Sequence, residues 1–265
     1  MRFKNKVVVV TGASRGIGQS VGVAFAREGA TMVGVARSDL AETAAKVKAA
    51  GGSFVAHNAD LGTGTQKESA EVIAQILAKT GQIDVLVNNA GIIRRAPAKD
   101  FSEADWNAVI ATNLNSPFFL MQAVGKWWIE SGRAKASETA RLKLVNIASL
   151  LSFQGGITVP AYAASKHGIA GVTKALSNEW AKERINVNAI APGYIATENT
   201  KALREDPVRN KAILDRIPEG RRCGSGGDID LDPRPGARLR GDHRAAAEVR
   251  GEVLHQRQAE VPLGA

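Results

Sequence analysis

A glycine-rich segment directly follows a run of four valines, and its position constrains the fold more than any other feature of the chain. The valines, Val7–Val10, have the composition of a buried strand, and the helical pattern of Val21–Glu28 follows the segment. Glycines between a strand and a helix allow a tight turn and a close approach to a pyrophosphate, while the first helical turn supplies free N–H groups. The segment therefore favours a nucleotide-binding turn over an ordinary one, with candidate contacts at Gly12, Arg15, Gly16, Ile17 and Gly18.

Short β-branched runs alternate with longer stretches of helical spacing along most of the chain. This alternation indicates right-handed crossovers, and hence a parallel sheet whose two faces are covered by helices. Ligands of such sheets bind at the carboxyl ends of the strands. The sequence therefore predicts the α/β class, with a single Rossmann-type, doubly wound parallel sheet. Besides Val7–Val10, the expected strands are Thr31–Val35, Val85–Val87, Leu144–Ile147 and Asn186–Ile190, and the expected helices include Leu40–Ala50 and Glu68–Lys79.

Composition narrows the class of protein. The chain has 265 residues, of which 44% are apolar, and it lacks the run of about 18 apolar residues that indicates a membrane span. Its first residues lead directly into Val7–Val10 without the apolar core of a signal peptide. The single cysteine, Cys223, excludes an intramolecular disulfide framework and fits a reducing compartment. We therefore expect a cytoplasmic protein with no membrane partner and no metal site.

The net charge of +9 is scattered, because Lys and Arg never occur in runs longer than two. Such scatter is typical of a solvated surface, with anionic substrates or cofactors as the alternative explanation. We accordingly expect no nucleic-acid partner.

The residues after the second expected strand indicate which nicotinamide cofactor the chain prefers. An acidic residue there would bind the ribose hydroxyls and favour NAD. This chain has Ala36 and Arg37 instead, and Arg15 lies in the glycine-rich turn. Two guanidiniums without a carboxylate suit a 2′-phosphate, whereas the alternative is a pair of ordinary exposed arginines. The sequence favours NADP without excluding NAD.

Two further segments carry candidate cofactor contacts. Asp60-Leu61 follows the polar end of the segment 53–57, and an Asp at a strand end can accept a hydrogen bond from an adenine amino group. A turn or a helix cap explains that Asp almost as well. In 88–91 small residues permit close approach of a flat ligand, and Asn side chains can tie adjacent strand ends together. The candidate contacts are Asp60, Leu61, Asn89, Ala90 and Gly91.

A tyrosine and a lysine carry the strongest catalytic signal. Tyr162 and Lys166 have i, i+4 spacing, which places them on one face of a helix. A nearby ammonium favours the phenolate, so we expect Lys166 to lower the pKa of Tyr162 toward working pH. Ser149, just beyond the strand Leu144–Ile147, could hold the substrate oxygen that Tyr162 protonates. A bare Tyr-x-x-x-Lys pair is common on protein surfaces, so its value depends on the motifs that accompany it.

Together these motifs resemble the short-chain dehydrogenase/reductase family over roughly residues 3–222. Finer matches are similar to the sugar-acid branch of that family, which includes 2-deoxy-D-gluconate 3-dehydrogenase, 2-dehydro-3-deoxy-D-gluconate 5-dehydrogenase and gluconate 5-dehydrogenase. The family motifs occur in order at Thr11–Gly18, Asn88–Gly91, Asn113, Ser149, Tyr162, Lys166 and Pro192-Gly193, and the branch motifs at Gly91–Arg95, Leu151–Gly156, Asn178–Ala181 and Arg216–Pro218.

The resemblance implies an oxidoreductase that moves a hydride between NAD(P) and a secondary alcohol or ketone of a sugar acid, such as 2-deoxy-D-gluconate or a related keto-deoxy-gluconate. By this resemblance Tyr162 is the acid/base, Lys166 binds the nicotinamide ribose and tunes Tyr162, and Ser149 polarises the substrate oxygen. Asn113 holds a water that links Lys166 to solvent, and Gln154 joins Ser149 and Tyr162 as a substrate contact.

The resemblance also assigns the segment after the last expected strand. Pro192, Ile195 and Thr197 would contact the nicotinamide end of the cofactor, where Ile195 and Thr197 position the carboxamide. Residues 197–217 would cover the substrate. Their basic side chains suit a carboxylate substrate, or else they form a solvated helix face; they are Lys201, Arg204, Arg209 and Lys211.

The composition changes abruptly near Arg222. Residues 221–265 hold eight Arg and no Lys, whereas residues 1–220 hold fifteen Lys and twelve Arg. The family pattern also stops there. The change suggests a shifted reading frame, with a genuinely divergent tail as the alternative. We expect a catalytic domain at 1–221 and a poorly ordered tail at 222–265, which puts the homodimer or tetramer typical of the family in doubt.

Two other functions share these residues. A reductase of acyl-carrier-bound 3-oxo esters uses the same catalytic groups. A truncated paralogue without activity would keep them but lack a stable scaffold. Whether the full chain is stable with its tail distinguishes the inactive paralogue from an enzyme.

Overall fold

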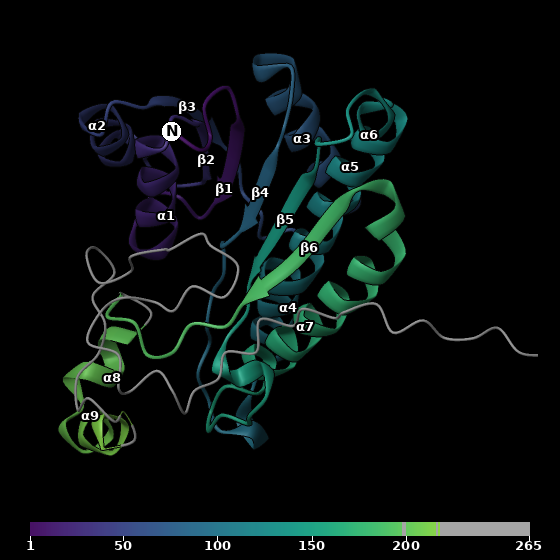
Figure 1. Cartoon of the computed structure of the whole chain (residues 1–265). Helices are drawn as coiled ribbons and strands as arrows, with labels where there is room; N and C mark the ends of the chain where they lie inside the picture. The colour runs from purple at the N-terminus through teal and green to yellow at the C-terminus, as the bar shows by residue number, and fades with distance from the viewer. Residues whose placement is uncertain (198–199, 216, 218–265) are drawn as a thin grey trace, which may run out of the picture.

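The structure, a computed structural model, describes residues 1–197, 200–215 and 217. Its centre is a six-stranded sheet in the order β3-β2-β1-β4-β5-β6, in which every neighbouring pair is parallel (Figure 1). The doubly wound parallel sheet expected from the sequence is therefore confirmed. The strands are β1 (Val7–Thr11), β2 (Thr31–Ala36), β3 (Ser53–Asn58), β4 (Val85–Asn88), β5 (Leu142–Ile147) and β6 (Ile185–Ile190).

Helices connect successive strands, and several match the expected periodic stretches to within a few residues. The chain order reverses between β1 and β4, and the crevice at such a reversal is where parallel sheets bind ligands. The α-helices are α1 (Gly16–Arg27), α2 (Ala41–Ala49), α3 (Gln66–Thr80), α4 (Glu103–Ile110), α5 (Ser116–Glu130), α6 (Arg133–Ala136), α7 (Pro160–Trp180), α8 (Lys201–Glu205) and α9 (Pro207–Leu214). Shorter helical turns are η1 (Ala98–Asp100), η2 (Ala111–Asn115), η3 (Leu150–Ser152) and η4 (Ala181–Glu183).

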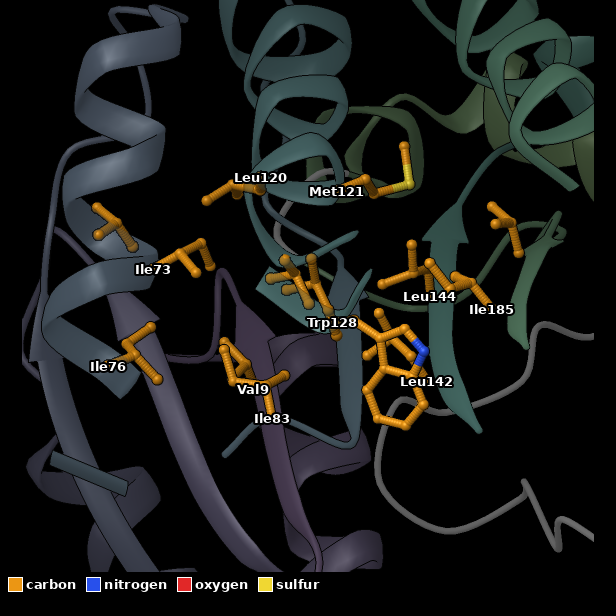
Figure 2. Close-up of a cluster of buried hydrophobic side chains, with 14 of the residues drawn as sticks. Val9, Ile73, Ile76, Ile83, Leu120, Met121, Trp128, Leu142, Leu144 and Ile185 are labelled. Carbon is orange, nitrogen blue, oxygen red and sulfur yellow. The ribbon is translucent and has the colours of Figure 1, made fainter. Parts of the chain in front are cut away.

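The four valines of β1 point alternately to the two faces of the sheet, because side chains alternate along a strand. Val7 and Val9 pack into the larger core, which α3, α5 and α7 share with the sheet. Figure 2 shows part of this core, with Trp128 packed beside Leu142. Val8 and Val10 pack on the opposite face, under α1 and α2. Burial on both sides explains why β1 is an uninterrupted apolar run.

The segment after β6 leaves the sheet. Helices α8 and α9 lie beyond the carboxyl end of β6 rather than on either face of the sheet (Figure 1). The tail expected to be poorly ordered, 222–265, lies outside the described residues. Among the helices that are described, none has both the length and the apolarity to cross a lipid bilayer.

Candidate active site

The glycine-rich turn brings the backbone of β1 close to that of β4. Gly12 has φ +64°, a left-handed conformation, and a Cβ there would lie 2.8 Å from Ala90 Cα. A Cβ on Gly18 would lie 2.4 Å from both Asn89 Nδ2 and the Gly12 carbonyl oxygen. Real Cβ atoms do not approach other atoms so closely. Glycine is therefore required at both positions for the turn to pack against the end of β4.

Hydrogen bonds fix the same two segments to each other. Thr11 Oγ1 accepts from the backbone N–H of Asn89 and of Ala90, both at 3.0 Å. Asn89 Nδ2 donates to the carbonyls of Thr11 and Gly12 at 3.0 and 3.2 Å. Asn88 Nδ2 donates to Asn146 Oδ1 of β5 at 2.9 Å. The expectation that asparagines tie adjacent strand ends together is confirmed.

A cavity of about 520 Å³ opens over these strand ends. The N-terminus of α1 faces it, and no side chain caps that helix, so its first N–H groups remain available to an anion. Thr197, from the segment after β6, lies over Gly16 at the rim. The predicted contacts that line the cavity are Gly12, Arg15, Gly16, Ile17, Arg37, Asp60, Leu61, Asn89, Ala90, Gly91 and Thr197.

Other predicted contacts have different positions. Gly18 is buried beneath the turn and acts through packing. Pro192 and Ile195 are partly buried but do not line the cavity, so their contact with the nicotinamide stays a prediction. Asp60 lines it, yet its Oδ1 accepts a hydrogen bond from the Gly62 N–H at 2.8 Å. Asp60 thus forms the turn that was the alternative interpretation, and its contact with adenine stays a prediction.

Two exposed arginines stand at one end of the cavity. Arg15 directly precedes α1, and Arg37 directly follows β2. The turns that carry them are joined by a 2.9 Å hydrogen bond from Ser38 Oγ to Ser14 Oγ. The cavity therefore has four hydrogen-bonding side chains at this end, two of them cationic, and no carboxylate directly follows β2. This donor set suits a phosphate.

The predicted catalytic groups meet at the carboxyl end of β5. Ser149 follows β5, and its hydroxyl forms a hydrogen bond with the Tyr162 phenol of α7. Lys166, one turn further along α7, is buried and donates from Nζ to the Ile147 carbonyl at 2.6 Å. The same Nζ lies 5.5 Å from the centre of the Tyr162 ring. The structure therefore brings Ser149, Tyr162 and Lys166 together.

The sequence predicted that Lys166 lowers the pKa of Tyr162. This prediction is wrong for the groups that the chain itself supplies. Burial raises the pKa of the Tyr162 phenol, while the hydrogen bond from Ser149 and the charge of Arg95 lower it by smaller amounts. Lys166 does not counteract this rise, because its ammonium lies against the ring and donates to a backbone carbonyl instead of to the phenol oxygen. Burial also lowers the pKa of Lys166 to about 8.

Asn113 lies in a π-helical turn, η2, between α4 and α5, a type of distortion frequent at functional sites. Its side chain pairs with the Ile92 backbone, accepting from N–H at 2.8 Å and donating to the carbonyl at 2.9 Å. Its Nδ2 also donates to Ser165 Oγ at 3.2 Å, and Ser165 donates to the Tyr162 carbonyl at 2.8 Å. Asn113 thus joins the end of β4 to α7, while the water expected on it stays a prediction.

The expected substrate contacts outside this group are less defined. Gln154 is exposed in the loop between η3 and α7, so its substrate contact stays a prediction. Lys211 of the expected covering segment forms an ion pair with Asp215 at 2.8 Å, and Arg204 Nη2 donates to the Thr197 carbonyl at 3.3 Å. These two side chains already have partners within the chain.

Sequence reasoning missed two residues near Tyr162. Arg95 was part of a motif match, but its electrostatic effect on Tyr162 depends on the fold. Ser152 is buried between Ser149 and α7 and forms hydrogen bonds toward both. The only sequence signal for Ser152 was its three-residue spacing from Ser149, the spacing of a capping box.

Known proteins share this sequence and architecture. Residues 6–208 match the family model of short chain dehydrogenases. The 2-dehydro-3-deoxy-D-gluconate 5-dehydrogenase of Dickeya dadantii is 47% identical over 219 residues, 83% of each chain. The Bacillus subtilis protein of the same name is 46% identical over 253 residues, which is 95% of this chain and 93% of its own.

A solved structure is also similar to this chain, and its name, like those of the two relatives, is that of a sugar-acid dehydrogenase. It is that of a candidate 2-deoxy-D-gluconate 3-dehydrogenase from Agrobacterium tumefaciens with bound NADP. It is 48% identical, with a TM-score of 0.76 over 84% of this chain and 85% of its own. The chain belongs to the short-chain dehydrogenase family.

Proposed function

We propose that this chain is an NADP-dependent dehydrogenase of a sugar acid, with 2-dehydro-3-deoxy-D-gluconate or 2-deoxy-D-gluconate as the leading substrates. The observation that carries the proposal is the meeting of Ser149, Tyr162 and Lys166 after β5, next in the sheet to β4, whose end borders the cavity. The names of the relatives from Dickeya dadantii, Bacillus subtilis and Agrobacterium tumefaciens support the sugar acid.

The residues of the cavity fit NADP. Gly12 allows the backbone of the turn to line the cavity, the N-terminus of α1 offers N–H groups to the pyrophosphate, and Arg15 and Arg37 suit the 2′-phosphate. When bound, NADP supplies or accepts the hydride. The remaining chemistry belongs to the chain.

The catalytic residues then divide the proton transfer between them. Leu151 N–H donates to Ser149 Oγ at 3.2 Å, which directs the proton of that hydroxyl toward Tyr162 or a substrate oxygen. Tyr162 takes the alcohol proton during oxidation and returns it during reduction. Lys166 contributes a buried cation under the Tyr162 ring, held there by the Ile147 carbonyl. Ser165 and Asn113 keep this part of α7 in register with the end of β4.

A substrate panel tests the proposed function. NADP-dependent oxidation would be measured with 2-dehydro-3-deoxy-D-gluconate, 2-deoxy-D-gluconate and D-gluconate. A 3-oxoacyl thioester serves as the competing substrate. We expect at least one sugar acid to give the highest kcat/KM. Preferential turnover of the thioester would instead establish the acyl reductase alternative, and no turnover of any substrate would support the inactive paralogue.

The cofactor preference leads to a first prediction. Arg15→Ala/Arg37→Ala removes two charge-assisted hydrogen bonds to the 2′-phosphate, each contributing about 1.5–3 kcal/mol. We expect kcat/KM for NADP to fall by a factor of about 10² or more, while kcat/KM for NAD changes little. Steady-state kinetics with both cofactors measure this, and Arg133→Ala, which lies over Trp127 outside the cavity, is the control. Equal losses for NAD and NADP would show that the arginines do not recognise the phosphate.

Arg95 leads to a second prediction, because its charge lowers the pKa of Tyr162. Oxidation needs the phenolate, whose population grows as pH rises through the Tyr162 pKa. Arg95→Gln raises that pKa, so we expect the ascending limb of kcat/KM for oxidation to move to higher pH. The matched control is Arg133→Gln. An unchanged pH profile would contradict the electrostatic role of Arg95.

A further inference from the structure

Ser149 and the Tyr162–Lys166 pair come from different elements, so their relative position depends on contacts between η3 and α7. The loop that joins these elements is a poor constraint. Phe153 and Ile157 in that loop are 56% and 86% exposed, and Gly155 has no neighbouring atom where a Cβ would stand. The alignment of the catalytic groups must therefore be set by direct bridges.

One buried hydroxyl forms such a bridge. Ser152, only 5% exposed, accepts from the Ser149 backbone N–H at 3.3 Å. It donates to the Lys166 carbonyl at 2.7 Å. Its own N–H donates to the Ser149 carbonyl at 2.9 Å, which completes one turn of η3. A single side chain thus contacts the backbones of two of the three catalytic residues.

We propose that Ser152 is a positioning residue, whose hydroxyl sets the distance between the Ser149 turn and the Tyr162–Lys166 face of α7. Removal of the hydroxyl leaves the partly buried Ser149 N–H without its acceptor and frees the turn to shift relative to α7. A small displacement between reacting groups is costly, about 10²-fold in rate for 1 Å. This inference rests on the proposed catalytic roles of Ser149, Tyr162 and Lys166.

The chain allows a direct measurement of that alignment. It has two tyrosines, Tyr162 and Tyr194, so tyrosinate absorbance during a pH titration reports on few groups. Subtraction of the titration of a matched Tyr162→Phe chain leaves the Tyr162 signal alone. The hydrogen bond from Ser149 lowers the pKa of Tyr162, so misalignment of Ser149 raises it. The measurement needs neither substrate nor turnover.

The test compares Ser152→Ala with Ser152→Thr, which restores a hydroxyl. For Ser152→Ala we expect kcat to fall about 10- to 100-fold, the Tyr162 titration to move to higher pH, and the Kd for NADP to stay within about twofold. Ser152→Thr should recover a large part of kcat and move the titration back. Ser69→Ala, which removes another buried serine hydroxyl far from the site on α3, should change none of these quantities.

The inference is overturned if Ser152→Ala keeps kcat within about twofold of the parent chain, or if its Tyr162 titration does not move. If Ser152→Ala does not fold, as judged by thermal denaturation, Ser152→Cys takes its place and the same criteria apply. Failure of the proposed function would be seen separately, as full turnover by Tyr162→Phe. The titration shift of Tyr162 does not depend on which substrate the chain uses.

Discussion

Tyr162→Phe should abolish turnover and leave the binding of NADP intact. The phenol supplies the proton that is exchanged with the substrate oxygen, and loss of a positioned acid/base costs about 10²–10⁴-fold in rate. The ring itself packs over Lys166, and Phe preserves that contact. The fold and the cavity around Gly12 and Arg15 should therefore be unchanged. Steady-state turnover together with titration of NADP against protein fluorescence measures both parts of the prediction.

His167, which lies five residues after Tyr162 on α7, supplies a control. His167 is exposed, and its ring nitrogen Nδ1 contacts the Ala163 carbonyl of the same helix at 3.0 Å. His167→Gln should keep turnover near that of the parent chain. Retention of more than half of the activity in Tyr162→Phe would mean that another group performs the proton transfer.

The fold was predictable where burial imposes a simple pattern. Val7–Val10 is apolar throughout because both faces of β1 are covered, and a run of this kind needs no tertiary information to be recognised. β3 was harder, since it lies at the edge of the sheet and most of its residues are partly or fully exposed. The sequence therefore showed only a short segment at 53–57 with a polar end.

The site was predictable where spacing along one element determines geometry. Tyr162 and Lys166 share a helix, so the i, i+4 spacing was sufficient to place them together. The pKa of Tyr162 was not predictable in this way. It depends on how deeply α7 buries the phenol and on where Lys166 directs its ammonium, which here is toward Ile147. Ser152 was missed for the same reason, because its two partners belong to different elements.

The surface beside β6 bears on the interpretation of the tail. On the face of the sheet opposite α7, Val145 and Ile147 of β5 are only partly buried, and Ile190 of β6 is 51% exposed. Within the described residues β6 pairs with one strand, β5. The carbonyl of Ile190 accepts from the Ala148 N–H at 2.7 Å, directly before Ser149. This edge of the sheet therefore supports Ser149.

Exchange of the tail should stabilise the chain. We propose that 222–265 arose from a shifted frame and contributes little to the core. Replacing it with the C-terminal segment of the Bacillus subtilis relative should then add a covering layer over Ile147 and Ile190. Burial of one large aliphatic side chain contributes about 1.5–3 kcal/mol, and each kcal/mol raises Tm by about 2–4 °C in a chain of this size. We expect Tm to rise by more than about 5 °C, and light scattering to show a larger oligomer.

Removal of the tail separates this interpretation from a genuinely divergent terminus. A chain that ends at Arg221 should have the same Tm as the full chain if the tail contributes no packing, because the edge of β6 would then be equally uncovered in both. A fall in Tm on removal, together with no rise on exchange, would show that the tail already stabilises the sheet. The two chains also test whether the β6 edge of the sheet holds Ser149 in position. If a covered β6 fixes the Ile190–Ala148 hydrogen bond, kcat should increase with Tm in the exchanged chain, since the serine follows Ala148 directly.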